Sequence, residues 1–130
     1  MSATNAGENI LLDAMFGNGR CAAVSSTLQF ALFTAAPGET GGGTEVSGGS
    51  YARVTYANDN TMWPAASGGV KANGAQIVFP TATGSWGTVT HWAIFDGSTM
   101  LVYGALASAV LPVSGNAPYF APGDIHINCD

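Results

Sequence analysis

The first apolar residues of the chain recur every three or four positions, which is the spacing of one face of an α-helix. The segment spans residues 6–16, and its apolar positions are Ile10, Leu11, Ala14 and Met15. Asn5 can cap its start, with Glu8 three residues later as in a capping box, and Gly17 can end it. The sequence therefore predicts one short helix, with residues 1–19 forming this helix and a turn.

Beyond the helix, apolar and polar residues alternate in short runs, as in strands with two different faces. The predicted strands span residues 27–34, 51–56, 69–72, 75–79, 88–95, 100–106, 109–113, 118–121 and 124–128. Aromatic residues on both faces of residues 27–34 indicate a central strand. Asn73 with Gly74 predicts a type I′ hairpin between two strands, and Asp96 with Gly97 predicts a second hairpin. Many short strands separated by turns predict an all-β fold, an antiparallel β-sandwich or barrel with one short N-terminal helix.

Two segments break the alternation. Residues 35–50 are rich in Gly, Pro, Ser and Thr, and Glu39 and Glu45 are their only charges. The sequence predicts a long exposed loop here, and loops of this length are usually functional or become ordered against a partner. In the second break, Trp63 precedes Pro64. We interpret Trp63 first as a plug over one end of the core and second as an exposed contact residue.

Composition narrows the function classes. The 130 residues fit one domain, and charged residues make up 8% of them, against roughly 25% in an average soluble domain. Such an uncharged surface favours contact with other protein, so the chain is more typical of an assembly component than of a free monomer. The three basic residues, Arg20, Arg53 and Lys71, are scattered in a chain of net charge −5, which argues against nucleic-acid binding. No apolar run is long enough to span a membrane and no signal peptide is recognisable, so we expect a soluble chain made in a cytosol.

Candidate reactive residues do not form a recognisable catalytic or metal-binding pattern. Cys21 and Cys129 lie near opposite ends of the chain. They are either two buried thiols or a bridge, which would need Cα atoms within about 7 Å. His126 and Cys129 are three residues apart on a predicted strand and face opposite sides, and zinc bound by both cysteines and His126 would require the termini to meet. His91 is best interpreted as structural. We therefore expect no catalytic residues, no cofactor and no metal.

The chain resembles small bacteriophage virion proteins that are often labelled phage tail fibre protein, and these are related to capsid cement or decoration proteins. The resemblance covers nearly the whole sequence. Its motifs are LLDAMF at 11–16, FALFTAAP at 30–37, TEVSGGSYARV at 44–54, PAASGGVKANGAQIVFPTATGSWGTVTHWAIFD at 64–96 and FAPGDIHI at 120–127. It implies a virion component without catalysis.

Two functional hypotheses follow. The first is a capsid decoration protein on the outer surface of the head, made in the host cytoplasm, which binds the major capsid protein and copies of itself, with a trimer as the first guess. The alternative is a tail or tail-fibre component involved in host attachment. A third interpretation, a cell-wall hydrolase, would require paired carboxylates in a cleft. The candidate contact residues are Ile10, Leu11, Met15, Phe16, Glu39, Glu45, Tyr51, Trp63 and Trp86.

Overall fold

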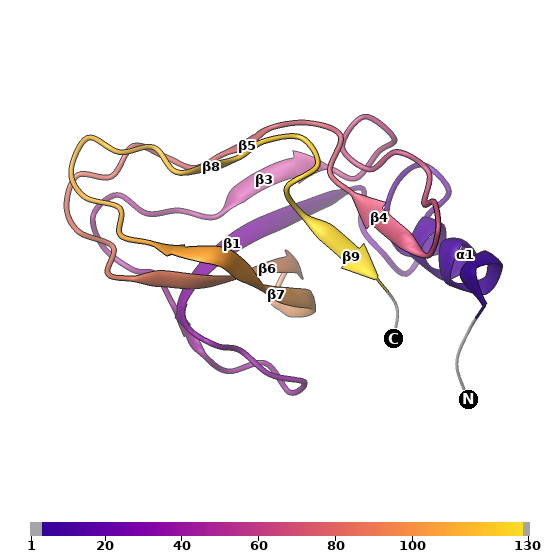
Figure 1. Cartoon of the computed structure of the whole chain (residues 1–130), viewed down its shortest axis with the longest axis horizontal. Coiled ribbons are helices and arrows are strands. Elements are labelled where there is room, and N and C mark those ends of the chain that lie inside the picture. Colours follow the sequence, from indigo (N-terminus) through magenta and orange to yellow (C-terminus); the bar gives the residue numbers. More distant parts are fainter. Residues whose placement is uncertain (1–3, 129–130) are drawn as a thin grey trace. The chain divides into compact units, whose positions relative to one another are not determined.

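The computed structural model describes residues 4–128 (Figure 1). Its elements are α1 (Asn5–Met15), β1 (Thr27–Ala35), β2 (Thr44–Glu45), β3 (Val54–Ala57), β4 (Val70–Ala72), β5 (Ile77–Val78), β6 (Val89–Asp96), β7 (Thr99–Val110), β8 (Tyr119–Phe120) and β9 (His126–Asn128). This arrangement confirms the predicted class, an antiparallel, sandwich-like all-β fold with one short N-terminal helix.

The described residues form two compact units, and the chain passes between them more than once. One unit comprises residues 4–27, Tyr56–Ile77 and 120–128, and the other comprises Leu28–Thr55 and Val78–Tyr119. We call them the helix unit and the sheet unit. The prediction of a single domain over residues 1–130 stays a prediction.

The sheet unit is built around β1, which pairs with β6 along one edge and with β2 along the other. The strand order is β2-β1-β6-β7, and β3 also pairs with β1. Phe33 lies opposite His91 of β6 and Glu45 of β2, so both edges of β1 are hydrogen-bonded. Seven of the side chains of β1 are buried or half-buried on its two faces, which confirms the predicted central strand.

β6 and β7 form the predicted hairpin at Asp96 and Gly97. Asp96 lies opposite Thr99, and Gly97 has a φ of 62°. β7 is longer than expected: it runs on through residues 107 and 108, where a break between two strands was predicted, and ends at Val110, so the separate strand at 109–113 is wrong. Two irregularities in the β6–β7 register accommodate the extra residues of β7.

In the helix unit, α1 begins one residue earlier than predicted. Thr4 is the N-cap, and its hydroxyl accepts a hydrogen bond from Gly7 N at 3.2 Å. Glu8 is therefore the fourth residue after the cap, and the capping box expected with Asn5 is wrong. Gly17 follows the last turn with a φ of 100°, as predicted for a helix stop.

The core of the helix unit surrounds Trp63. This indole is 0% exposed, and its ring lies 5.0 Å from the ring of Phe16 and 6.2 Å from that of Tyr56. Asn58 is also buried. Its amide donates to Met15 O and accepts from Gly17 N, so it satisfies backbone groups that the end of α1 leaves unpaired. Trp63 thus fills the core, in agreement with its interpretation as a plug.

The Asn73–Gly74 hairpin is wrong, because β4 pairs with β9 and β5 pairs with β8. Asn73 is buried instead, and its amide donates to Ala121 O while its carbonyl accepts from Ile125 N. At Gly74, a Cβ would lie 2.6 Å from Thr61 O. Gly74 therefore allows close packing against Thr61, and the Asn73 side chain forms hydrogen bonds to Ala121 and Ile125. Neither residue has the positive φ of the predicted turn.

Lys71 is buried at 1% exposure and forms an ion pair with Asp13 of α1. The ammonium lies 2.5 Å from Asp13 Oδ1, which also accepts a hydrogen bond from Ala66 N at 2.9 Å. Hydrogen bonds from Lys71 and then from Ala66 lower the pKa of Asp13 below its ordinary value of 3.8. These contacts hold α1 against β4 and the segment before it.

We expect Asp13→Ala to lower the free energy of unfolding by about 1–3 kcal/mol, because it leaves a buried ammonium unpaired while Asp13 itself is partly solvated. Since the pKa of Asp13 is lowered in the folded chain, its stabilisation is present above 3.8 and is lost as pH falls through the folded value. Urea unfolding from pH 7 to pH 2.5 should show a steeper loss for the wild type than for the variant. Equal slopes would contradict the assignment, and the double variant with Lys71→Met is the control that removes the buried charge.

Candidate functional site

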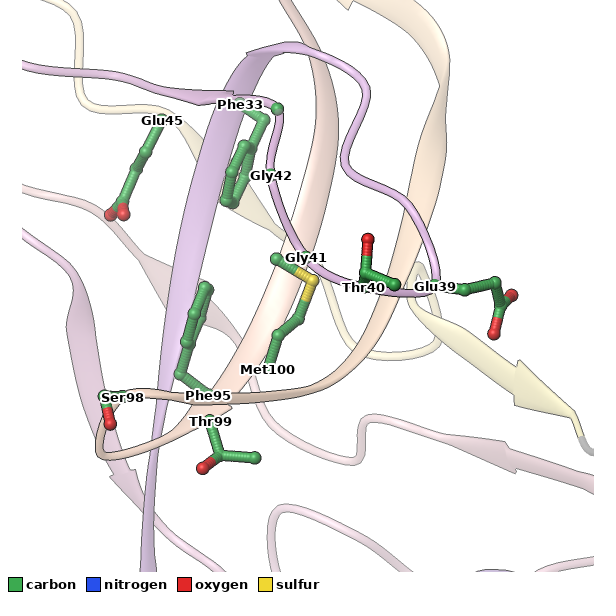
Figure 2. Close-up of a pocket in the computed structure, with 11 residues that line it drawn as sticks. Phe33, Glu39, Thr40, Gly41, Gly42, Glu45, Phe95, Ser98, Thr99 and Met100 are labelled. Carbon is green, nitrogen blue, oxygen red and sulfur yellow. The ribbon is translucent and has the colours of Figure 1, made fainter.

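An open groove of about 590 Å³ lies in the sheet unit between the glycine-rich loop and the ends of β1, β6 and β7 (Figure 2). It is lined by Phe33, Glu39, Thr40, Gly41, Gly42, Gly43, Glu45, Phe95, Ser98, Thr99 and Met100. Figure 2 shows Met100 pointing toward Gly41, and the side chain of Glu39 pointing away from the centre of the groove. We call it the loop groove.

The loop of the groove folds back because β2 pairs with β1. Thr44 lies opposite Ala35, so the chain must reverse within the residues between them. Gly38 and Gly41 exchange two backbone hydrogen bonds of 2.9 Å. The strand β2 interrupts the loop predicted over residues 35–50, so that prediction is wrong for Thr44 and Glu45 and the reversal is shorter than expected.

Glycine is required in this reversal. Gly41, Gly42 and Gly43 have φ values of 86°, 78° and 75°, a region that side chains with a Cβ disfavour. A Cβ on Gly43 would lie 2.7 Å from Ala35 O, whereas a Cβ on Gly42 would meet nothing within 4 Å. Gly43 is therefore fixed by both conformation and space, and Gly42 by conformation alone.

The floor of the loop groove is aromatic. The rings of Phe33 and Phe95 stack with centroids 6.3 Å apart and an interplanar angle of 7°, and Met100 packs against the cluster that contains them. Both phenylalanines are buried, at 3% and 7% exposure. They support the groove from below rather than offering a flat exposed ring.

Arg53, Glu45 and Tyr51 form a charged network beside this floor. Arg53 donates to Glu45 through two nitrogens, with Nε to Oε2 at 2.9 Å and Nη2 to Oε1 at 2.8 Å. The Tyr51 hydroxyl donates to Glu45 Oε2 at 2.8 Å and accepts from Leu32 N at 3.0 Å. The guanidinium carbon also lies 3.8 Å from the centroid of the Phe95 ring, a cation–π contact.

The network sets the ionisation of its members. Burial by itself would raise the pKa of Glu45, but hydrogen bonds from Arg53 and Tyr51 outweigh it, and the pKa is lowered from 4.5. The hydrogen bond to Glu45 raises the pKa of Arg53. Burial raises the pKa of the Tyr51 hydroxyl. Glu45 and Arg53 therefore form a stable ion pair at neutral pH.

Glu39 is the second carboxylate of the groove, and it is exposed. It accepts a hydrogen bond from the Tyr103 hydroxyl at 3.3 Å, and its charge raises the pKa of that hydroxyl. Acid–base cleavage of a glycosidic bond needs one carboxyl with a raised pKa to act as the acid. Glu45 has the opposite shift, so its environment does not suit the role of acid.

The chemistry of the loop groove suits an uncharged polar ligand with an apolar face. Thr40, Ser98 and Thr99 bring hydroxyls, and Met100 brings a deformable apolar contact.

Among residues 4–128, no group of three or more His, Cys, Asp or Glu side chains could hold a metal ion. Within the same residues, no helix is long and apolar enough to cross a membrane.

The structure brings together three of the residues predicted to make contacts, Glu39, Glu45 and Tyr51. Glu45 and Glu39 line the groove, and Tyr51 binds Glu45. Ile10 and Leu11 are exposed on α1, at 70% and 56%, and Met15 is half-buried. Three further residues, Phe16, Trp63 and Trp86, are buried, and they present no surface to a partner in this structure.

Trp86 was predicted to contact a partner, but its side chain is buried. It is 4% exposed, and its Nε1 donates to Gly49 O at 2.8 Å while its ring meets Tyr51 edge-on at 5.3 Å. Sequence reasoning missed Phe95 and Met100 as groove residues and Arg53 as the partner of Glu45. The hairpin signal at residues 96–97 was present, but only the strand order shows that its end faces the loop.

The structure describes only one of the two cysteines in the predicted pair. Cys21 is exposed, so the interpretation as a buried thiol is wrong for it. Cys129 lies outside the described residues, and so do the bridge and the zinc site that would need it. His91, interpreted as structural, is half-buried, with Nδ1 2.8 Å from Thr90 Oγ1.

Comparison with known proteins supplies the family. A family model described as "Podophage GP4 fiber I protein gp80" matches residues 2–128. The chain belongs to this family. The match confirms the resemblance to phage virion proteins labelled as fibres, and it favours the fibre alternative over a decoration protein. A search of curated proteins found no match.

We expect Gly43→Ala to destabilise the fold more than Gly42→Ala. Both substitutions place a Cβ at positive φ, which costs about 1–2 kcal/mol, but only the former also meets backbone atoms at 2.7 Å. Urea unfolding of both variants measures the difference. Equal losses would show that the loop moves to accept the Cβ.

We expect Arg53→Met to raise the pKa of Glu45 relative to the wild type. The variant removes the strongest interaction that lowers this pKa, while burial, which raises it, remains. Titration of the Glu45 side-chain carboxyl by NMR measures the change, with Glu8 in the same spectra as the internal control. An unchanged Glu45 titration would contradict the network.

Proposed function

We propose that this chain is a non-enzymatic subunit of a tail fibre on a phage virion and that it takes part in attachment to the host. The observation that carries the proposal is the match to a podophage fibre protein over residues 2–128. Capsid decoration was the first hypothesis from the sequence. The family described by the match is a fibre family, and we therefore prefer the fibre role.

The loop groove supports an attachment role. Host surfaces offer sugars, which present many hydroxyls and a partly apolar ring face. The groove presents hydroxyls from Thr40, Ser98 and Thr99 beside Met100, and its aromatic floor is buried and stacked. Preorganised walls lower the cost of ordering on binding. We assign the groove as the contact surface for a host glycan.

The test is competition for adsorption. Host cells are incubated with purified full-length chain, and the rate at which phage particles then adsorb is measured. We expect the wild-type chain to slow adsorption, because it occupies the receptor that the fibre uses. Thr40→Arg should lose this effect, since a long charged side chain on an exposed groove residue fills the groove.

Thr81→Arg is the matched control, since Thr81 is also an exposed threonine of the sheet unit and does not line the groove. It should compete as well as the wild type. If the wild-type chain leaves adsorption unchanged while heads without the chain break at lower temperature, the decoration role is correct instead. If Thr40→Arg competes fully, the groove is not the contact surface.

A further inference from the structure

β7 forms one edge of the sheet in the sheet unit. In the strand order β2-β1-β6-β7 it stands at the end, and within residues 4–128 β6 is the strand with which it pairs (Figure 1). One face of β7 is covered where Gly104 lies under Trp92, since a Cβ there would come within 2.7 Å of the indole. The opposite face exposes Tyr103 at 38%, and Ala105 is exposed as well.

This edge lacks the usual chemical protection against pairing. Natural edge strands carry Lys, Pro or inward-pointing charges that discourage another strand from adding to them. β7 has 12 residues, TMLVYGALASAV, and none of them is charged or proline. Its two bulges disturb the ladder near each end, but residues 102–105 pair regularly with residues 91–94 between them. A regular, uncharged stretch of edge is therefore available.

An exposed apolar surface continues directly from the end of β7. Val110, Leu111 and Val113 are 43%, 58% and 46% exposed. The segment is held in place, because Trp86 N donates to Pro112 O at 3.0 Å. The apolar side chains are therefore presented by ordered backbone rather than by a free tail.

Charge indicates which partner fits. Residues 97–123, which include β7 and this apolar segment, form the longest uncharged run of the chain, while the whole chain carries a net charge of −5. Two copies repel each other through their acidic residues, and this repulsion is weakest where the contacting surface is uncharged. Interface centres are likewise depleted in charge and enriched in Tyr and Met.

We propose that β7 and the exposed residues Val110, Leu111 and Val113 form the interface with a second copy of this chain, by antiparallel pairing of the two β7 edges. Such a contact is isologous, so the same residues face each other across a two-fold axis and the assembly closes as a pair. The free N–H and C=O groups of one edge satisfy those of the other. This inference is independent of the proposed attachment function and differs from the trimer predicted from sequence.

The test is sedimentation velocity of the full-length chain over a wide concentration range. We expect the wild type to shift from the mass of the chain to twice that mass as concentration rises. Ala105→Lys should raise the dissociation constant at least about tenfold, since it places like charges across the two-fold axis of an edge pair. Ala65→Lys is the control, because Ala65 is an exposed alanine of the helix unit and the change in net charge is identical.

Val113→Lys is a second test in case Ala105→Lys does not fold. Val113 lies outside β7, and its replacement should weaken the pair in the same direction. Circular dichroism and thermal unfolding show whether each variant is folded. The inference is overturned if the wild type remains monomeric at every concentration or forms trimers. It is equally overturned if Ala65→Lys weakens association as much as the folded β7 and Val113 variants do.

Discussion

Arg53 connects four segments of the sheet unit through its side chain. Its guanidinium donates to Glu45 of β2 through two nitrogens, reaches Gln29 Oε1 of β1 and Gly97 O of the hairpin at 3.4 Å each, and lies over the ring of Phe95. A bidentate pair between a guanidinium and a carboxylate fixes the relative orientation of the two groups as well as their distance. The loop groove depends on this contact, because Glu45 forms one wall and Phe95 the floor.

The helix unit uses polar side chains for the same purpose. Asn58 and Asn73 are buried and satisfy backbone groups at the end of α1 and in the segment before β9, while Lys71 pairs with Asp13. Short strands leave many backbone groups without ladder partners, and unpaired buried groups are costly. Side-chain amides and one ammonium supply the missing partners in place of longer strands.

All three basic side chains of the chain bind groups within the fold itself. Arg20 donates to Asn58 O at 3.0 Å, Arg53 binds Glu45 and Lys71 binds Asp13. The surface that remains is acidic or uncharged, and its uncharged part gathers in residues 97–123. A neutral surface costs less to desolvate than a charged one, which suits the fibre subunit proposed above. Scarcity of charge thus connects internal architecture with assembly.

The sequence by itself determined the class of the fold, the helix near Ile10, the central position of β1 and the β6–β7 hairpin. Each of these rests on local periodicity or on a turn signal, which acts between residues close in the chain. The sequence also contained both carboxylates of the groove. It did not show that Glu45 pairs with Arg53, that Trp86 is buried, or that Asn73 and Gly74 serve packing rather than a hairpin. Those outcomes depend on which distant strands pair, such as β4 with β9, and on contacts across many residues. Only the tertiary structure decided them, because a buried polar group is satisfied by whichever partner the fold brings near, and local pattern carries no record of that partner.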